Sequence, residues 1–367
     1  MQLITLPVFS PGQFKLAHHY LATRVTDMMG RKLEEEDWAR VYCASKGIPR
    51  AGWSNTDIDV MFGHVGVEHK MICSRSKGSI RDACGTTIMH PAGTRQIRIP
   101  TETDPTKAAR IILAQYGALI ERRKALVRTL DQYNNGLLDR AQAIAKLRVE
   151  IGYNASGASD RVPTIPIPSP HGFREPELRT GWLLWQDSLR EFLYFEEPMT
   201  PPDPSDYWGE WRDRAGSGSR QASRNLWIYH RERKEKHFSI TTDAGPKVQP
   251  YFKVPVVDDP NLYYFVVQAE DYGSGLTRVW VSQITASLLV RKLGDTTPET
   301  LARAIDSMRF ESLDRPSQEP SIGPLAVPLL VPTQAYERIR SELKGVSDEH
   351  NFKQFVELLD PITFSVA

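Results

Sequence analysis

The proline-rich stretch at residues 157–176 is the feature that most restricts how this chain can fold. Its centre reads VPTIPIP at residues 162–168. Proline lacks a backbone N–H and crowds the preceding turn, so neither a helix nor a central strand can continue through such a run. The chain has 367 residues, whereas single hydrophobic cores usually stop growing at roughly 250 to 300 residues. We therefore expect a linker at residues 157–180 between two domains, residues 1–156 and 181–367.

The pattern of apolar residues before the linker is typical of a mixed α/β domain. Apolar residues recur at helical spacing in three segments, and two short apolar runs separated by Gly63-His64 indicate a β-hairpin. The expected helices are Gln13–Met29, Leu33–Ser45 and Asp104–Gln132, and the expected strands are Ile58–Phe62, Val65–Ile72 and Ile97–Ile99.

Short β-type runs dominate the part that follows the linker, and helical patterns return near the C-terminal end. This order predicts a β-rich second domain and an α/β (α+β) class for the whole chain. The expected strands are Trp182–Trp185, Phe192–Phe195, Leu226–Tyr229, His237–Thr241, Tyr263–Gln268 and Thr277–Ser282, and the expected helices are Pro298–Met308 and Thr333–Leu343.

Charge and cysteine content exclude several classes of protein. There are 46 Lys and Arg against 45 Asp and Glu, a net charge of +1, which argues against a protein that coats nucleic acid over its whole surface. The three cysteines lack CxxC spacing, so neither a disulfide framework nor a zinc site is indicated. No segment resembles a membrane helix or a secretory signal, and we expect a cytoplasmic protein.

Four charged residues on the expected hairpin indicate a site for chemistry. Side chains two apart on a strand share a face, so Glu68 and Lys70 project together, and Asp57 and Asp59 do the same on the neighbouring strand. Carboxylate oxygens are the ligands that Mg²⁺ prefers. A lysine beside them can hold a water molecule or stabilise a negatively charged phosphate in the transition state. This combination is suited to hydrolysis of phosphodiester bonds.

These residues resemble the pattern of the PD-(D/E)xK nuclease superfamily, in which an Asp opens one strand and a (D/E)xK triplet lies on the next. Here Thr56-Asp57 or Ile58-Asp59 precedes Glu68-His69-Lys70, with Thr56 or Ile58 in place of the proline. The choice between Asp57 and Asp59 as the main metal ligand stays open. Members often add a carboxylate from the preceding helix, for which the candidates are Glu35, Glu36 and Asp37.

The resemblance implies a restriction-endonuclease-like core, with a mixed central sheet flanked by helices, at residues 1–156. It also implies Mg²⁺ as cofactor, with Mn²⁺ as a substitute, and double-stranded DNA as substrate. A type II restriction endonuclease is the expected activity, and the β-rich domain then serves target recognition or dimerisation. Because cutting both strands generally requires two active sites, we expect a homodimer.

Basic and amide side chains outside the hairpin are candidates for DNA contact. Arginine and lysine near a metal site can neutralise phosphates, and Arg, Gln and Asn can read base edges. The candidates are Arg75, Lys77, Arg81, Arg95, Arg98, Arg220, Gln221, Arg224 and Asn225. A further basic group, Arg122, Arg123, Lys124 and Arg128, lies on the long expected helix and can complement its C-terminus.

Two alternatives to a restriction enzyme stay open. One is a modification-dependent or mobile-element nuclease of the same fold, and cleavage of methylated against unmethylated DNA would distinguish it. The other is a non-catalytic DNA-binding protein whose hairpin charges only decorate the surface. A metal titration separates this alternative from either nuclease, because only clustered carboxylates bind Mn²⁺ or Mg²⁺.

Overall fold

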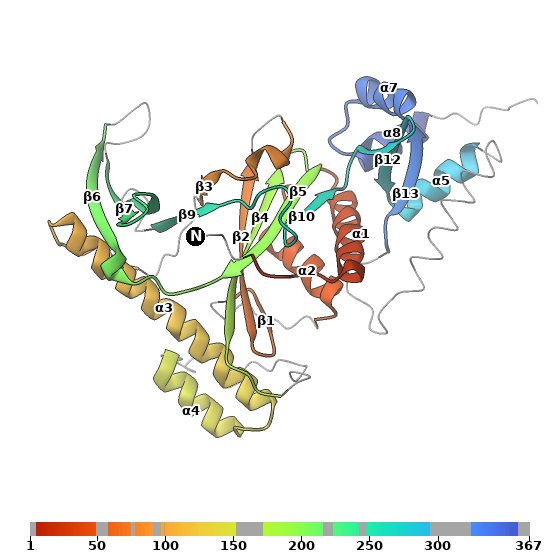
Figure 1. Ribbon diagram of the computed structural model, residues 1–367. Coiled ribbons are helices and arrows are strands. Elements are labelled where there is room, and N and C mark those ends of the chain that lie inside the picture. Colours follow the sequence, from red (N-terminus) through yellow and green to blue (C-terminus); the bar gives the residue numbers. More distant parts are fainter. Residues whose placement is uncertain are drawn as a thin grey trace, which may run out of the picture.

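The computed structural model describes residues 5–48, 58–74, 78–90, 97–98, 100–151, 172–215, 223–241, 247–293 and 324–358. In these ranges the chain forms a mixed α/β structure with a central sheet, a second sheet that extends from it along a long helix, and a small C-terminal unit (Figure 1). The expected α+β class is confirmed.

Two helices near the start of the chain cover one face of the central sheet. Helix α1, Pro11–Met28, begins at a capping box between Ser10 and Gln13, and α2, Glu35–Lys46, ends at Gly47. The backbone of Gly47 has a φ of 66°, a left-handed conformation that glycine adopts without steric cost. Leu21 of α1 and Trp38 of α2 are buried in the same apolar core as Phe192 and Tyr194 of the sheet.

The central sheet has the order β1-β2-β4-β5-β10. Its strands are β1 (Val60–Phe62), β2 (Val65–Ser74), β4 (Glu177–Gln186), β5 (Glu191–Pro198) and β10 (Tyr263–Val266). Strands β1 and β2 form the expected hairpin, with Phe62 paired to Val65 across a two-residue turn. Gly63 in this turn has a φ of 56°, which favours glycine.

Strands from both sides of the expected linker lie together in this sheet. Strand β2 pairs in parallel with β4, from Val65 opposite Glu177 to Ser74 opposite Gln186. Residues 177–180, assigned to the linker from the sequence, are the beginning of β4. The expected strands near residues 182 and 192 therefore complete the sheet that carries the hairpin, rather than a separate β-rich core.

Helix α3, Pro105–Asn134, starts at Asp104, whose carboxylate accepts from two backbone N–H groups, and packs beside α4, Arg140–Ile151. A five-stranded sheet with the order β3-β9-β8-β7-β6 lies along the first half of α3. We call this sheet the arm. Its strands are β3 (Thr87–Met89), β6 (Tyr207–Arg214), β7 (Ser223–His230), β8 (Lys236–Thr241) and β9 (Lys247–Lys253). Short 3-10 helices η1 (Ile80–Ala83) and η2 (Pro204–Asp206) precede β3 and β6.

The C-terminal unit contains a three-stranded sheet and three helices. The elements are β11 (Glu270–Gly273), β12 (Leu276–Val281), α5 (Gln283–Leu293), β13 (Val327–Pro332), α7 (Thr333–Leu343) and α8 (Asp348–Leu358). Their apolar core includes Val279, Leu289, Tyr336 and Phe352.

The expected helix at residues 333–343 is confirmed as α7, whereas the expected helix at residues 298–308 lies outside the described residues. The expected strand at residues 97–99 is wrong for Ile97 and Arg98, which lie in an irregular segment. Ile97 instead packs into the core between α3 and the arm. In the described part of the chain, no helix is long and apolar enough to span a membrane.

Candidate active site on the β1–β2 hairpin

The hairpin brings Asp59 and Glu68 to the same level of the central sheet. Val60 on β1 pairs with Val67 on β2, so Asp59, which comes just before β1, lies beside Glu68. The backbone N–H of His69 donates to Asp59 Oδ2 over 2.6 Å. This hydrogen bond fixes the position of the Asp59 carboxylate, because the donor belongs to a paired strand.

Glu68 is the centre of a compact charged group. Its Oε1 accepts from Lys70 Nζ at 2.6 Å and from Arg123 Nη2 at 3.2 Å. Lys70 follows Glu68 by two residues and therefore projects from the same face of β2. Arg123 comes from α3, and its side chain is only 11% exposed. The group thus combines a local pair with a cation from a distant element.

Carboxylates crowd together around Lys70. Burial, then the nearby charges of Glu68 and Glu35, raise the pKa of Asp59 to about 7. The pKa of Glu35, at the start of α2, is also raised by burial and by Glu68, and Lys70 partly offsets the rise. Like charges close together and partly removed from water disfavour ionisation. A cation at this position would relieve the repulsion.

The neighbouring strands supply a partly buried surface around this group. Glu68 pairs with Thr180 and Lys70 with Trp182 in the parallel register, so these side chains share one face. The Nε1–H of Trp182 donates to Glu197 Oε1 at 2.8 Å. Burial raises the pKa of Glu197. Glu197 is therefore a further carboxylate on the face that carries Glu68 and Lys70.

The opposite face of β2 belongs to the core. The His69 ring is fully buried, with ring centroids 5.0 Å from Tyr42 and 5.9 Å from Tyr194. Its two ring nitrogens have no hydrogen-bond partner among the described residues. Burial lowers the pKa of His69 to about 3, so the ring is neutral and serves packing rather than the charged group on the other face.

The donor set at the hairpin fits a hard divalent cation. Asp59, Glu68 and Glu35 offer carboxylate oxygens, and burial, with a smaller contribution from the Glu68 charge, raises the pKa of both Asp59 and Glu35. Within the described ranges, no three acidic, His or Cys side chains already stand close enough together to enclose a metal ion. Asp57, the alternative aspartate, lies outside the described residues.

Of the three acidic residues at the start of α2, Glu35 is the one that interacts with Glu68 and Lys70. Glu36 pairs with Arg40 at 2.8 Å, one turn along the same helix. Asp37 is bound by Arg24 and Arg31. Asp37 therefore links α2 to α1 through Arg24, whereas the Glu36 pair lies within α2.

The expected DNA-contacting residues fall on separate parts of the fold. Arg81 lies in η1 with its guanidinium 5.1 Å from the Tyr264 ring, and the backbone of Arg98 bonds to Gln115 on α3. Arg224 and Asn225 lie on β7 of the arm. The remaining candidates, Arg75, Lys77, Arg95, Arg220 and Gln221, lie outside the described residues.

Sequence reasoning assigned Arg123 only to a basic helix end and did not find Glu197 or Tyr116. Tyr116 lies two turns before Arg123 on α3. Burial raises the pKa of Tyr116, and the charges of Arg123, Glu68 and Glu197 also act on it. The seven-residue spacing of Tyr116 and Arg123, two helical turns, puts both on one side of α3. This spacing is the sequence feature that could have identified Tyr116 and Arg123 as neighbours.

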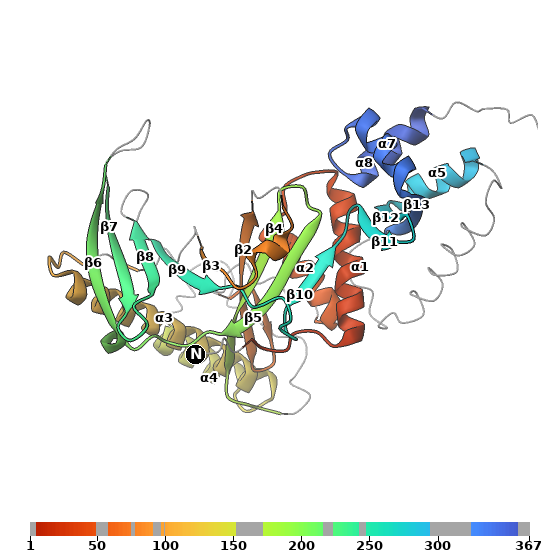
Figure 2. The same ribbon diagram turned by 45° about the horizontal axis from the view of Figure 1, so that its top comes forward.

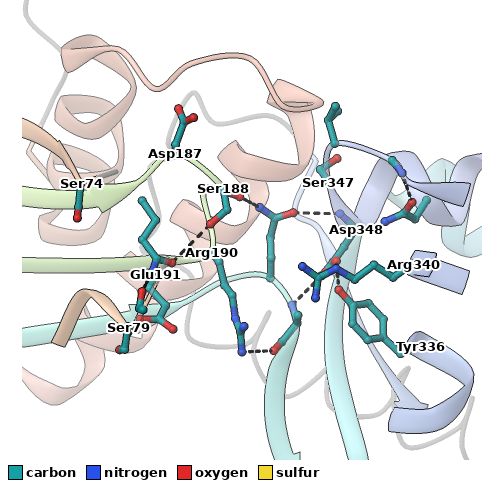
Figure 3. A pocket seen from close by; sticks show the side chains of 17 residues that line it. Ser74, Ser79, Asp187, Ser188, Arg190, Glu191, Tyr336, Arg340, Ser347 and Asp348 are labelled. Atoms are coloured by element: carbon teal, nitrogen blue, oxygen red, sulfur yellow. Dashed lines mark hydrogen bonds between the residues drawn. The ribbon is translucent and has the colours of Figure 1, made fainter. Parts of the chain in front are cut away.

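A polar cavity of about 620 Å³ lies elsewhere, between the β4–β5 turn and α7–α8 (Figure 3). Ser74 at its rim is six residues beyond Glu68, roughly 20 Å along a strand. Two of its carboxylates form hydrogen bonds within the fold: Glu191 accepts from Ser79 at 2.6 Å, and Asp348 accepts from Tyr336 at 2.9 Å. The cavity thus lies where polar side chains of the central sheet meet those of the C-terminal unit.

Comparison with protein-family models, with curated protein sequences and with solved structures found no match. The argument for function therefore depends on the residues of the hairpin and their surroundings.

Proposed function

We propose that this chain is a metal-dependent endonuclease that hydrolyses phosphodiester bonds in double-stranded DNA, with a PD-(D/E)xK-type active site. The observation that carries the proposal is the placement of Asp59 beside Glu68 and Lys70 on a hairpin, with a carboxyl pKa of about 7 at Asp59. A perturbed carboxyl group with a specific charge partner is a candidate functional group. A sequence-specific type II restriction enzyme is the activity that we propose.

Asp59 and Glu68 would hold Mg²⁺ or Mn²⁺, with Glu35 close enough to share in the charge balance. When bound, the cation would polarise the scissile phosphate and lower the pKa of a water molecule. If Glu68 Oε1 bound the metal ion, it would no longer accept hydrogen bonds from Lys70 and Arg123. The two freed cationic groups would then face the phosphate.

Lys70 has the geometry for a direct role. Its Nζ lies 2.6 Å from Glu68 Oε1, and its side chain is 28% exposed, so it can reach solvent as well as the carboxylate. The ammonium group would hold the attacking water molecule and stabilise the negative charge that accumulates on the phosphate oxygens. Arg123, on the other side of the same carboxylate, would add a second positive charge.

The decisive experiment compares DNA cleavage by wild type and by two variants, Lys70→Ala and Glu68→Gln. Phage and plasmid DNA, both methylated and unmethylated, would be incubated with each protein in Mg²⁺ or in EDTA. We expect discrete fragments from wild type in Mg²⁺ alone, and a loss of at least about a hundredfold in rate for each variant. The matched controls are Lys353→Ala and Glu337→Gln, exposed residues of α8 and α7, which should cut like wild type.

Metal binding gives an independent readout. Mn²⁺ titration should show binding to wild type that Glu68→Gln weakens and Glu337→Gln leaves unchanged. Intact DNA with every substrate, together with no Mn²⁺ binding, would overturn the nuclease proposal and favour a non-catalytic DNA-binding protein. Cleavage of methylated DNA only would keep the chemistry and assign the chain to the modification-dependent enzymes.

A further inference from the structure

The two faces of the arm sheet differ in chemistry. One face packs against α3 through Leu226, Ile228 and Ile240. Figure 2 shows β6, β7, β8 and β9 side by side, with α3 along them. The strand pairing places a different set of residues on the other side of the sheet. We call this side the outer face and define it by Trp208, Arg212, Trp227, Tyr229, Lys236 and Tyr251.

Lys236 is held between two aromatic rings on the outer face. Its Nζ lies 3.5 Å from the centroid of Trp227 and 4.8 Å from that of Tyr251. In the described parts of the chain, no carboxylate forms an ion pair with it. Attraction between an ammonium group and ring faces fixes the charge without neutralising it. An external anion can therefore pair with it.

A β-bulge places Lys236 on this face. Ser239 pairs with Trp227, and Lys236 pairs with Tyr229, so the four residues of β8 from Lys236 to Ser239 lie opposite three residues of β7. Side chains alternate along a regular strand, and without the extra residue Lys236 would point toward α3. A bulge that redirects a side chain in this way is typical of functional positions.

Other cations lie near Lys236. The Arg212 guanidinium lies 5.3 Å from the Trp227 ring and pairs with Glu210 at 2.9 Å. Lys253 is exposed and lies two residues after Tyr251 on β9. Among the described residues named so far, the cations are Lys236, Arg212 and Lys253 and the carboxylate is Glu210, whereas the whole chain has a net charge of only +1. A second copy docked on this face would bring like charges together, whereas a polyanion is complementary.

We infer that the outer face of the arm binds the phosphate backbone of double-stranded DNA. This inference rests on the proposed function, and it adds a place where the duplex is held outside the active site. Rings that immobilise Lys236 and Arg212 reduce the entropy cost of each phosphate contact.

The distance between the arm and the hairpin site is short enough for one duplex to contact both. Ala109 of α3 packs under the arm, and Arg123 of the same helix reaches Glu68. These positions are separated by 14 residues of helix, or roughly 20 Å. That separation equals about six base pairs at 3.4 Å each, less than one turn of the duplex.

The test measures binding of the full-length protein to a fluorescein-labelled 30-base-pair duplex in EDTA, so that no cleavage takes place. Affinity would be measured as a function of salt for wild type, Lys236→Gln and the double variant Lys236→Gln/Arg212→Gln. Loss of one phosphate contact should weaken binding roughly tenfold at 0.1 M salt and reduce the salt slope by about one. Lys236→Arg keeps the charge and the ring contact and should bind like wild type, and Lys353→Gln is the control outside the arm.

Unchanged affinity and salt slope in Lys236→Gln would overturn the inference, as would the absence of DNA binding by wild type. If Lys236→Gln changed the protein from dimer to monomer without changing its DNA affinity, the outer face would instead bind a second copy of the chain. The experiment distinguishes a failure of this inference from a failure of the nuclease proposal. Weaker binding by Lys236→Gln would support the arm surface even if wild type failed to cleave, and normal cleavage with unchanged binding would reject the arm surface alone.

Discussion

Lys70 Nζ and Arg123 Nη2 donate to the same oxygen, Glu68 Oε1, at 2.6 and 3.2 Å. One donor comes from the hairpin and the other from α3, so the carboxylate joins two elements that are 53 residues apart in the sequence. A divalent cation at Asp59 and Glu68 would compete with both donors. This competition leads to the first prediction.

Replacement of Arg123 by methionine should separate metal binding from catalysis. Removing a positive charge beside Glu68 should tighten Mn²⁺ binding roughly tenfold, because like charges in a partly buried site repel each other. Cleavage should nevertheless become slower, since a charge that faces the phosphate is lost. Calorimetric titration with Mn²⁺ and cleavage rates would test both effects, with Arg110→Met on the same helix as control. Weaker Mn²⁺ binding would show that Arg123 instead holds Glu68 in its binding position.

The effect of Mn²⁺ on stability should depend on pH through Asp59. Its pKa of about 7 in the folded protein is above the ordinary value of 3.8, so the folded state binds more protons between these pH values and its stability falls as pH rises. Cation binding needs the ionised form, and the increase in melting temperature with Mn²⁺ should grow from pH 5.5 to pH 7.5 and then level off. Asp59→Asn should remove this dependence. Equal increases at both pH values would contradict the prediction.

Acid should destabilise the protein through His69. The pKa of this buried ring is about 3, below the ordinary value of 6.5, so the unfolded chain takes up a proton first as pH falls. Stability from His69 is fully present above pH 6.5 and is lost toward pH 3, by about 1.4 kcal/mol per pH unit. Urea unfolding of His69→Leu should therefore show a flatter decline between pH 6.5 and pH 4.5. A parallel decline in both proteins would exclude this cause.

The buried carboxylate of Glu196 should make Arg179 important for stability. Glu196 is 0% exposed and accepts from Arg179 at 2.9 Å and from the Tyr194 hydroxyl at 2.8 Å. Arg179→Met should cost about 3 to 5 kcal/mol, because it leaves a buried charge without its partner. The double variant Arg179→Met/Glu196→Gln should recover part of this loss in urea unfolding. If Arg179→Met were as stable as wild type, the hydrogen bond from Tyr194 would be enough to stabilise the Glu196 carboxylate.

The sequence predicted the hairpin well because its signals are local. The turn at Gly63-His64 and the alternation of side chains around Glu68 and Lys70 depend only on neighbouring residues. The pairing of β2 with β4 could not be predicted in this way, since it joins segments on both sides of the proline-rich stretch. Period-two patterns identify strands, but they do not say which strand lies beside which.

The residues that surround Glu68 and Lys70 could not be predicted from the sequence for the same reason. Arg123 and Glu197 reach the face of Glu68 and Lys70 from α3 and β5, and nothing in their local sequence marks them as neighbours. Glu35 was one of three equivalent acidic residues, and only the packing of α2 separated it from Glu36 and Asp37. The bulge that turns Lys236 to the outer face likewise depends on pairing between strands.

The parallel pairing of β2 and β4 sets a time at which the protein can become complete during its synthesis. Val65 must wait for Glu177, 112 residues later in the chain, before the two strands can join. At about 5 to 20 residues per second, this delay is roughly 6 to 22 seconds on the ribosome. The acidic hairpin therefore emerges long before its neighbouring strand, and a nascent chain of this protein carries the charged residues of the site without the sheet that orders them.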